Sequence, residues 1–120
     1  MRFAVMIAAF LSFGAVAHAG DVADGEKLFK KCKSCHVIDK ETNKTGPHLV
    51  GIIGRQAGSV DSYKKYSKAL QESGIIWDAD TLDAFLASPK KYLKGTKMAF
   101  AGLKKDEDRQ NIIAYMESMQ

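Results

Sequence analysis

Cysteine, proline, histidine and tryptophan are scarce in this chain of 120 residues, which contains two cysteines, two prolines, three histidines and one tryptophan. The two cysteines are three positions apart, so a disulfide between them would close a very short loop and stabilise the fold little. No internal repeat or low-complexity tract is present. The 18 basic residues outnumber the 14 acidic ones, but they do not alternate with aromatic side chains, so nucleic-acid binding is not expected.

Only one long apolar run is present, and it lies at the start of the chain. Arg2 precedes an apolar stretch from Phe3 to Val16, and Ala17-His18-Ala19 has the small-x-small pattern of a cleavage site. This layout predicts a cleaved secretory signal peptide over residues 1–19 and a single domain over residues 20–120. The run is shorter than the roughly 20 residues of a membrane span. An uncleaved anchor and a core helix remain as alternatives.

The sequence Cys32-Lys33-Ser34-Cys35-His36 is typical of the attachment site of a c-type haem. Two thiols at this spacing can add to the two vinyl groups on one edge of a porphyrin, and the following imidazole can bind the iron. We therefore expect one haem c, attached through two thioether bonds. A thiol or zinc module without haem is the competing interpretation, but structural zinc normally takes four protein ligands and few are available.

The hydrophobic pattern predicts an all-α fold of about four to five helices, with long loops wrapped around the haem. Glycines punctuate the stretch from Val37 to Ser62, which predicts a loop. In the last helix, an apolar stripe predicts the buried residues Ile112, Ile113, Met116 and Met119. The predicted helices are residues 21 to the attachment site, 63–72, 78–88, 89–93 and 106 onward.

The chain resembles the class I c-type cytochromes, the small carriers that include mitochondrial cytochrome c and its bacterial periplasmic relatives. The resemblance extends from Gly25 to Tyr115, and the predicted signal peptide indicates the bacterial, periplasmic branch. Its motifs are Gly25-Glu26-Lys27-Leu28-Phe29, Cys32 to His36, Thr45-Gly46-Pro47-His48-Leu49, Tyr66-Ser67-Lys68-Ala69, Trp77, Pro89-Lys90-Lys91-Tyr92, Gly95 to Gly102, and Asn111-Ile112-Ile113-Ala114-Tyr115.

This resemblance implies an iron ligated by His36 and Met98. The carbonyl of Pro47 would accept a hydrogen bond from the other ring nitrogen of His36, which would orient the ring and raise its basicity. Two other methionines, Met116 and Met119, lie on the predicted core stripe, and His48 is expected at the surface.

The resemblance also implies contacts to the haem propionates from Arg55, Tyr66, Trp77 and Thr96. Phe100 would lie near the exposed haem edge. Three positions depart from common family residues: Phe85 replaces a tyrosine, Leu70 replaces a polar residue and Lys94 replaces a proline. A crossing of the first and last helices is implied at Gly25, Phe29, Ile112 and Tyr115.

The function implied is that of a monomeric one-electron carrier in the periplasm, without stable membrane insertion and without enzyme activity. A six-coordinate iron has no open position for substrate. Lysines around the haem edge would attract acidic redox partners, such as a bc-type complex, a terminal oxidase, a reaction centre or a periplasmic reductase or dehydrogenase. The alternative is a haem enzyme with peroxidase-like or small-gas reactivity after loss of the methionine ligand.

Overall fold

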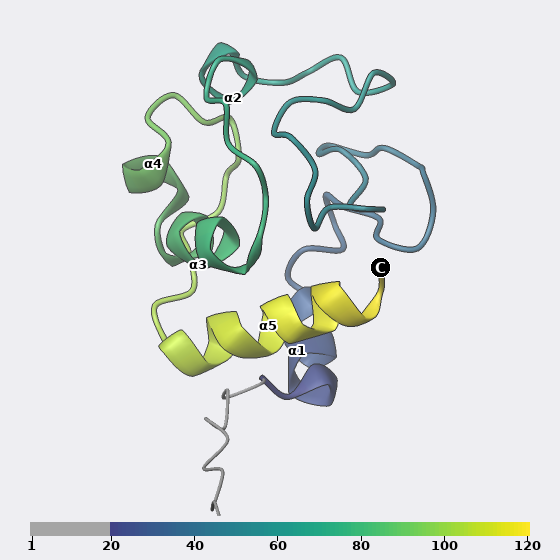
Figure 1. Cartoon of the computed structure of the whole chain (residues 1–120), viewed down its shortest axis with the longest axis vertical. Helices are drawn as coiled ribbons and strands as arrows, with labels where there is room; N and C mark the ends of the chain where they lie inside the picture. The colour runs from purple at the N-terminus through teal and green to yellow at the C-terminus, as the bar shows by residue number, and fades with distance from the viewer. Residues whose placement is uncertain (1–19) are drawn as a thin grey trace, which may run out of the picture.

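The computed structural model describes residues 20–120, which form five helices joined by long irregular segments (Figure 1). The predicted signal peptide, residues 1–19, lies outside the described residues. Within residues 20–120 the only sheet-like pairing is an isolated bridge between Gln56 and Ile76, so the all-α prediction is confirmed. The helices are α1 (Val22–Phe29), α2 (Lys68–Gln71), α3 (Ala79–Ala87), α4 (Pro89–Tyr92) and α5 (Asp106–Ser118).

Local capping fixes where α1 and α3 begin. The Asp21 carboxylate accepts a hydrogen bond from the Asp24 amide at 2.9 Å. Asp78 accepts from the Thr81 amide at 2.8 Å, and the Thr81 hydroxyl accepts from the Asp78 amide at 2.9 Å, which completes a capping box. Pro89 occupies the first turn of α4, where its missing amide donor costs nothing. These three helix starts were predicted correctly.

Two predicted helices are shorter than expected. The first ends at Phe29 instead of reaching the attachment site, because the following amides, including those of Lys31 and Cys32, bond to carbonyls three residues back. The helix predicted over residues 63–72 begins only at Lys68. The Ser67 hydroxyl accepts from the Leu70 amide at 3.1 Å and caps the helix there.

The first and last helices cross closely at Gly25 (Figure 1). A Cβ atom at this position would lie 1.9 Å from the Asn111 carbonyl oxygen, so only glycine fits without a shift of the backbone. Beside the crossing, the rings of Phe29 and Tyr115 pack with their centroids 5.3 Å apart. The Asp21 amide donates to Asn111 Oδ1 at 2.8 Å across a separation of 90 residues. The helix crossing implied by the sequence is therefore present.

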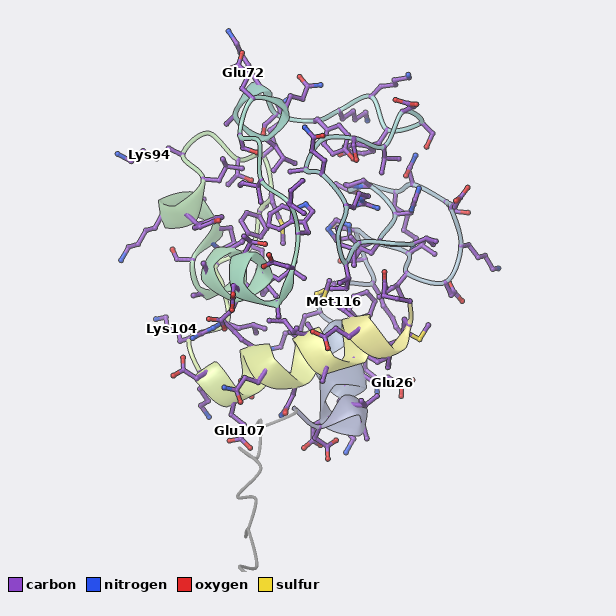
Figure 2. All side chains as sticks on the ribbon, viewed as in Figure 1. Glu26, Glu72, Lys94, Lys104, Glu107 and Met116 are labelled. Atoms are coloured by element: carbon purple, nitrogen blue, oxygen red, sulfur yellow. The ribbon has the colours of Figure 1, made fainter. Side chains whose placement is uncertain are left out.

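The buried face of α5 ends one turn earlier than predicted. Ile112, Ile113 and Met116 are buried, and Met116 points into the molecule (Figure 2). The prediction was wrong for Met119, which is 39% exposed. Met119 follows the last helical residue, so its side chain no longer continues the helical stripe.

The remaining elements lie above this crossing, on two sides of the molecule. The segment from residue 37 to 62 occupies one side, and α3, α4 and the segment 93–105 occupy the other (Figure 1). Trp77 lies in the core and packs against Phe85 of α3 at 5.0 Å between ring centroids. Within residues 20–120, no helix combines the length and apolar character that a membrane span requires.

Candidate functional site

The two cysteines follow α1 in consecutive turns of backbone. The amides of Cys35 and His36 both donate to the Cys32 carbonyl, at 3.1 and 2.9 Å. Both thiols are free and partly buried. Burial, reinforced by the neighbouring Cys35, raises the pKa of Cys32 to about 11 against the opposing effect of Lys31. Cys32 is therefore a protonated thiol at neutral pH, unlike the low-pKa cysteines of thiol enzymes.

The imidazole of His36 is oriented by one hydrogen bond. Its Nδ1 lies 2.7 Å from the Pro47 carbonyl oxygen, and because a carbonyl can only accept, Nδ1 carries the proton. Burial lowers the pKa of His36, while the bond to Pro47 raises it and the charge of Arg55 lowers it further. The ring is accordingly neutral at neutral pH, with the lone pair of Nε2 available to a metal.

Gly46 makes room for this ring. A Cβ atom at Gly46 would lie 2.4 Å from Cε1 of His36 and under 3.0 Å from both ring nitrogens. The Gly46 amide also donates to the Cys35 carbonyl at 2.8 Å, which joins this loop to the attachment segment. Gly46 belongs to a motif quoted above, but its contact with the ring was not predicted from the sequence.

The expectation of a surface histidine at position 48 is wrong, because His48 is only 7% exposed. Its amide donates to Asn43 Oδ1 at 3.0 Å, and its Nδ1 accepts from the Val50 amide at 3.2 Å. These bonds fold the side chain beneath its own loop. Asn43 also donates to Ser62 Oγ at 2.9 Å, so one amide side chain joins the loop that carries Pro47 to the loop before Tyr66.

Arg55 and Trp77 are joined by their backbones. The Trp77 amide donates to the Arg55 carbonyl at 2.9 Å, and the Gly54 amide donates to the Trp77 carbonyl at 2.6 Å. One terminal nitrogen of Arg55 donates to the carbonyls of His48 and Val50, at 2.9 and 3.2 Å. Burial lowers the pKa of the Arg55 guanidinium, and Tyr66 is close enough to oppose that shift.

The side chains of Arg55, Tyr66 and Trp77 have more hydrogen-bond donors than the surrounding protein has acceptors for them. Within residues 20–120, the Trp77 indole N–H and the other nitrogens of Arg55 have no hydrogen-bond acceptor, and Arg55 has no acidic partner. The Tyr66 oxygen accepts from the Val60 amide at 3.2 Å, which leaves its own O–H free to donate. A half-buried cation beside unused donors is the environment that a carboxylate needs when it leaves water.

Met98 and Thr96 come from the segment between α4 and α5. The Met98 amide donates to the Thr96 hydroxyl at 3.2 Å, and Met98 is partly buried against the core. In the described part of the chain, no hydrogen bond links either residue to the segment of Cys32 and His36. The structure therefore brings His36 and Pro47 into contact, joins Arg55 to Trp77, and holds Met98 and Thr96 on a separate segment.

The chemistry of these residues fits a haem c. Two free thiols at the required spacing stand beside a neutral imidazole with one unused nitrogen, and the free donors of Arg55 and Trp77 suit propionate groups. A zinc site is disfavoured, because residues 20–120 contain no group of three or more His, Cys, Asp or Glu side chains placed to hold a metal ion. Iron in a haem needs only axial ligands from the protein, so this finding does not conflict with a haem.

The chain is similar in sequence to known cytochromes c. Residues 22–120 match the family model for cytochrome c. Over 99 residues the chain is 50% identical to cytochrome c type-1 of Ascaris suum, covering 82% of this chain and 88% of that relative. It is 49% identical to cytochrome c of Chlamydomonas reinhardtii over 109 residues, covering 89% of this chain and 96% of the relative.

A solved structure agrees with these relatives. Cytochrome cH from Methylobacterium extorquens matches with a TM-score of 0.77 and 43% identity, covering 82% of this chain and 99% of that structure. The family match covers the cysteines, His36 and the helix crossing described above. The chain therefore belongs to the cytochrome c family of haem-containing electron carriers, and it binds one haem c covalently.

Proposed function

We propose that this protein is a periplasmic one-electron carrier whose haem iron is ligated by His36 and Met98. The observation that carries this proposal is the 2.7 Å bond from His36 Nδ1 to the Pro47 carbonyl. It fixes the tautomer that leaves Nε2 free, and it makes the imidazole a stronger donor to a metal. Among the methionines of residues 20–120, Met98 is the one that is partly buried in an irregular segment. Met116 is packed in the core, and Met119 follows α5.

When bound, the haem supplies an iron that gains or loses one electron. The chain's own residues would hold this group in place: Cys32 and Cys35 through thioether bonds, and His36 and Met98 as ligands to the iron. Arg55, Tyr66, Trp77 and Thr96 would donate hydrogen bonds to its carboxylates. Partly buried apolar side chains that pack against the core, including Leu70 and Phe100, would keep water away from the haem. With both axial positions taken, we propose that the protein is not an enzyme.

We also propose that residues 1–19 are a signal peptide that is removed on export, leaving a single domain over residues 20–120. An exported protein with a free Cys-x-x-Cys pair would be exposed to oxidation. Attachment of the haem uses both thiols and removes that hazard.

Exposed lysines supply the attraction for redox partners. The lysines near the attachment segment, on α4 and just before α5 are all exposed, and Lys94 and Lys104 project outward on the side of α4 (Figure 2). We propose that these charges steer the protein to acidic partners of a respiratory or photosynthetic chain, such as a bc-type complex, a terminal oxidase, a reaction centre or a periplasmic reductase or dehydrogenase. The monomer is the working form, and nucleic acid is not a partner.

A redox titration followed by optical spectra tests the ligand assignment. Met98→Ala should remove the spectral features of the methionine ligand and lower the midpoint potential, while His36 and both thioether bonds are retained. Met119→Ala is the matched control, because Met119 lies in the exposed C-terminal turn. Unchanged spectra in Met98→Ala would contradict the assignment. Rapid peroxide turnover by the unaltered protein at neutral pH would instead support an enzyme.

A further inference from the structure

The segment that carries Met98 has no helix or strand, but it is held at both ends. Upstream, the Thr96 amide donates to the Leu93 carbonyl at 3.1 Å. Downstream, the Leu103 amide donates to the Leu86 carbonyl at 2.7 Å, at the end of α3. Gly102 lies so close to α3 that a Cβ atom there would be 2.4 Å from the Ala87 carbonyl oxygen. The downstream end is therefore packed tightly, whereas residues 97 and 99 are exposed.

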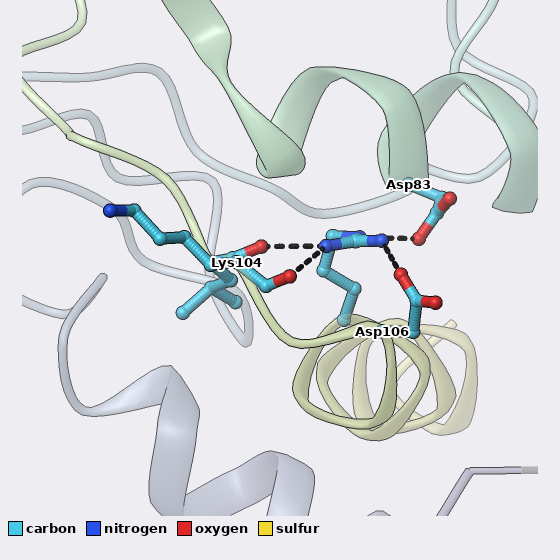
Figure 3. Close-up of polar contacts among 5 residues, drawn as sticks. Asp83, Lys104 and Asp106 are labelled. Carbon is cyan, nitrogen blue, oxygen red and sulfur yellow. Dashed lines mark hydrogen bonds and ion pairs between the residues drawn. The ribbon is translucent and has the colours of Figure 1, made fainter.

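The buried arginine Arg109 contacts this downstream end, and Figure 3 draws these contacts around the labelled Asp83, Lys104 and Asp106. Arg109, in the first half of α5, is 8% exposed. One of its terminal nitrogens donates to the carbonyls of Leu103 and Lys104, at 2.8 and 3.1 Å. Its Nε donates to Asp83 of α3 at 2.7 Å, and its other terminal nitrogen pairs with Asp106. Arg109 thus joins α3, α5 and the end of the Met98 segment.

The contacts of Arg109 differ in how much they are expected to stabilise the segment. The Leu103 carbonyl bond is buried, and the Asp83 side chain is 47% exposed. The Asp106 side chain is 82% exposed, so water and salt screen that pair. A buried guanidinium that loses a shielded partner is costly, because its charge then remains in the interior uncompensated. The Asp83 and carbonyl contacts should therefore dominate over the contact with Asp106.

The shape of the side chain matters as much as its charge. Arginine presents five donors in a rigid planar fork, so it can bond two backbone carbonyls and a carboxylate at once. Lysine has one flexible ammonium and cannot reproduce that arrangement. Because α5 is packed closely against α1, the fork ties the backbone after Met98 to this helix crossing.

We propose that Arg109 is a positioning residue for the axial methionine. It fixes the downstream end of residues 93–105 and so keeps Met98 from moving away from the iron. This inference rests on the proposed Met98 ligation and goes beyond it, since it names the contact on which the ligand's residence depends. If Arg109 served only to join α3 to α5, its loss would weaken the whole fold without favouring local release of Met98.

The experiment compares Arg109→Lys with the unaltered haem-loaded protein during urea titration. Two signals are followed: the absorption band of the methionine ligand, and far-ultraviolet circular dichroism for global unfolding. Exchange of the Leu103 amide, measured by NMR without urea, reports opening of the segment directly. We expect the opening constant to rise at least about tenfold, because bonds from a charged donor to buried carbonyls are lost. The methionine band should disappear at clearly lower urea than the helical signal.

Two further variants make the test specific. Ile112→Val lowers global stability from inside the α1–α5 core and should move both urea transitions together. Asp83→Asn should speed exchange of the Leu103 amide more than Asp106→Asn does, because the Asp83 carboxylate is less exposed and its ion pair is less screened by water. The reverse order, or a parallel shift of both transitions in Arg109→Lys, would overturn the positioning role.

If Met98 does not ligate the iron, the same experiment gives a different result. In that case the unaltered protein would lack the methionine band, which overturns the proposed ligand and this inference together. A normal band in the unaltered protein with parallel transitions in Arg109→Lys overturns the inference alone.

Discussion

Substituting Gly46 by alanine should disturb the axial histidine directly. The added Cβ would lie 2.4 Å from Cε1 of His36, whereas ordinary contact begins at 3.4 Å, so the ring must move by about 1 Å. The bond from Nδ1 to the Pro47 carbonyl is 2.7 Å long, and such a displacement would take it to the limit of hydrogen-bond geometry. Overpacking of this kind costs about 1–3 kcal/mol.

Two measurements on the haem-loaded protein check this expectation. Urea unfolding should show a loss of about 2 kcal/mol, which is about 1 M in the midpoint for a domain of this size. The redox midpoint should rise, because an imidazole that loses its Nδ1 acceptor is less basic and stabilises the ferric iron less.

Gly51→Ala serves as the control for a glycine substitution in the same loop. Gly51 has a φ of 68°, but nothing lies within 4 Å of a Cβ placed there. This variant should lose about 1 kcal/mol through backbone strain and keep its midpoint potential. Should Gly46→Ala retain both the potential and the stability of the unaltered protein, the close packing of His36 would not matter to the iron.

Three further predictions follow from named contacts. Gly25→Ala should lower the unfolding free energy by about 2 kcal/mol in urea titrations, because its Cβ would meet the Asn111 carbonyl at 1.9 Å; an increase in stability would contradict the close crossing. Its control, Ala84→Gly at an exposed position of α3, should lose about 1 kcal/mol through helix propensity. The bonds from Thr81 lower the pKa of Asp78 below 3.8, so the stability that Asp78 contributes should be complete above that pH and lost as the pH falls through the lowered value. Asp78→Asn should flatten that part of the pH profile of urea unfolding, and an unchanged profile would remove the carboxylate from the cap. Reduction of the ferric protein by ferrocyanide should slow as ionic strength rises from about 10 to about 150 mM, and more weakly in Lys90→Glu; a rate independent of salt would argue against steering by lysines.

The attachment site and most helix starts could be predicted from the sequence because their determinants are local. Cys32, Cys35 and His36 are adjacent, and a cap such as Asp78 is three residues from its partner Thr81. Local signals also have limits. The hydrophobic pattern placed a helix start at Tyr63, but the hydroxyl of Ser67 caps it four residues later.

Contacts between distant segments could not be predicted in this way. The burial of His48 depends on the curl of its loop, and the bond from Asn43 to Ser62 has no signature in either stretch of sequence. The i,i+3 spacing of Asp106 and Arg109 puts the two side chains on one helix turn, but no ion pair was predicted there. The spacing gave no sign that the same guanidinium reaches Asp83 and the Leu103 carbonyl.

The crossing of α1 and α5 has a consequence for biosynthesis. The Asp21–Asn111 contact joins residues 90 positions apart, so the native arrangement cannot form on a nascent chain that still lacks Asn111 and Tyr115. Until α5 has packed against α1, the segment that follows α1 is not enclosed by the complete fold, so the two thiols remain accessible for haem attachment. Prematurely terminated products would lack the closing helix and would be degraded rather than accumulate as partly active protein.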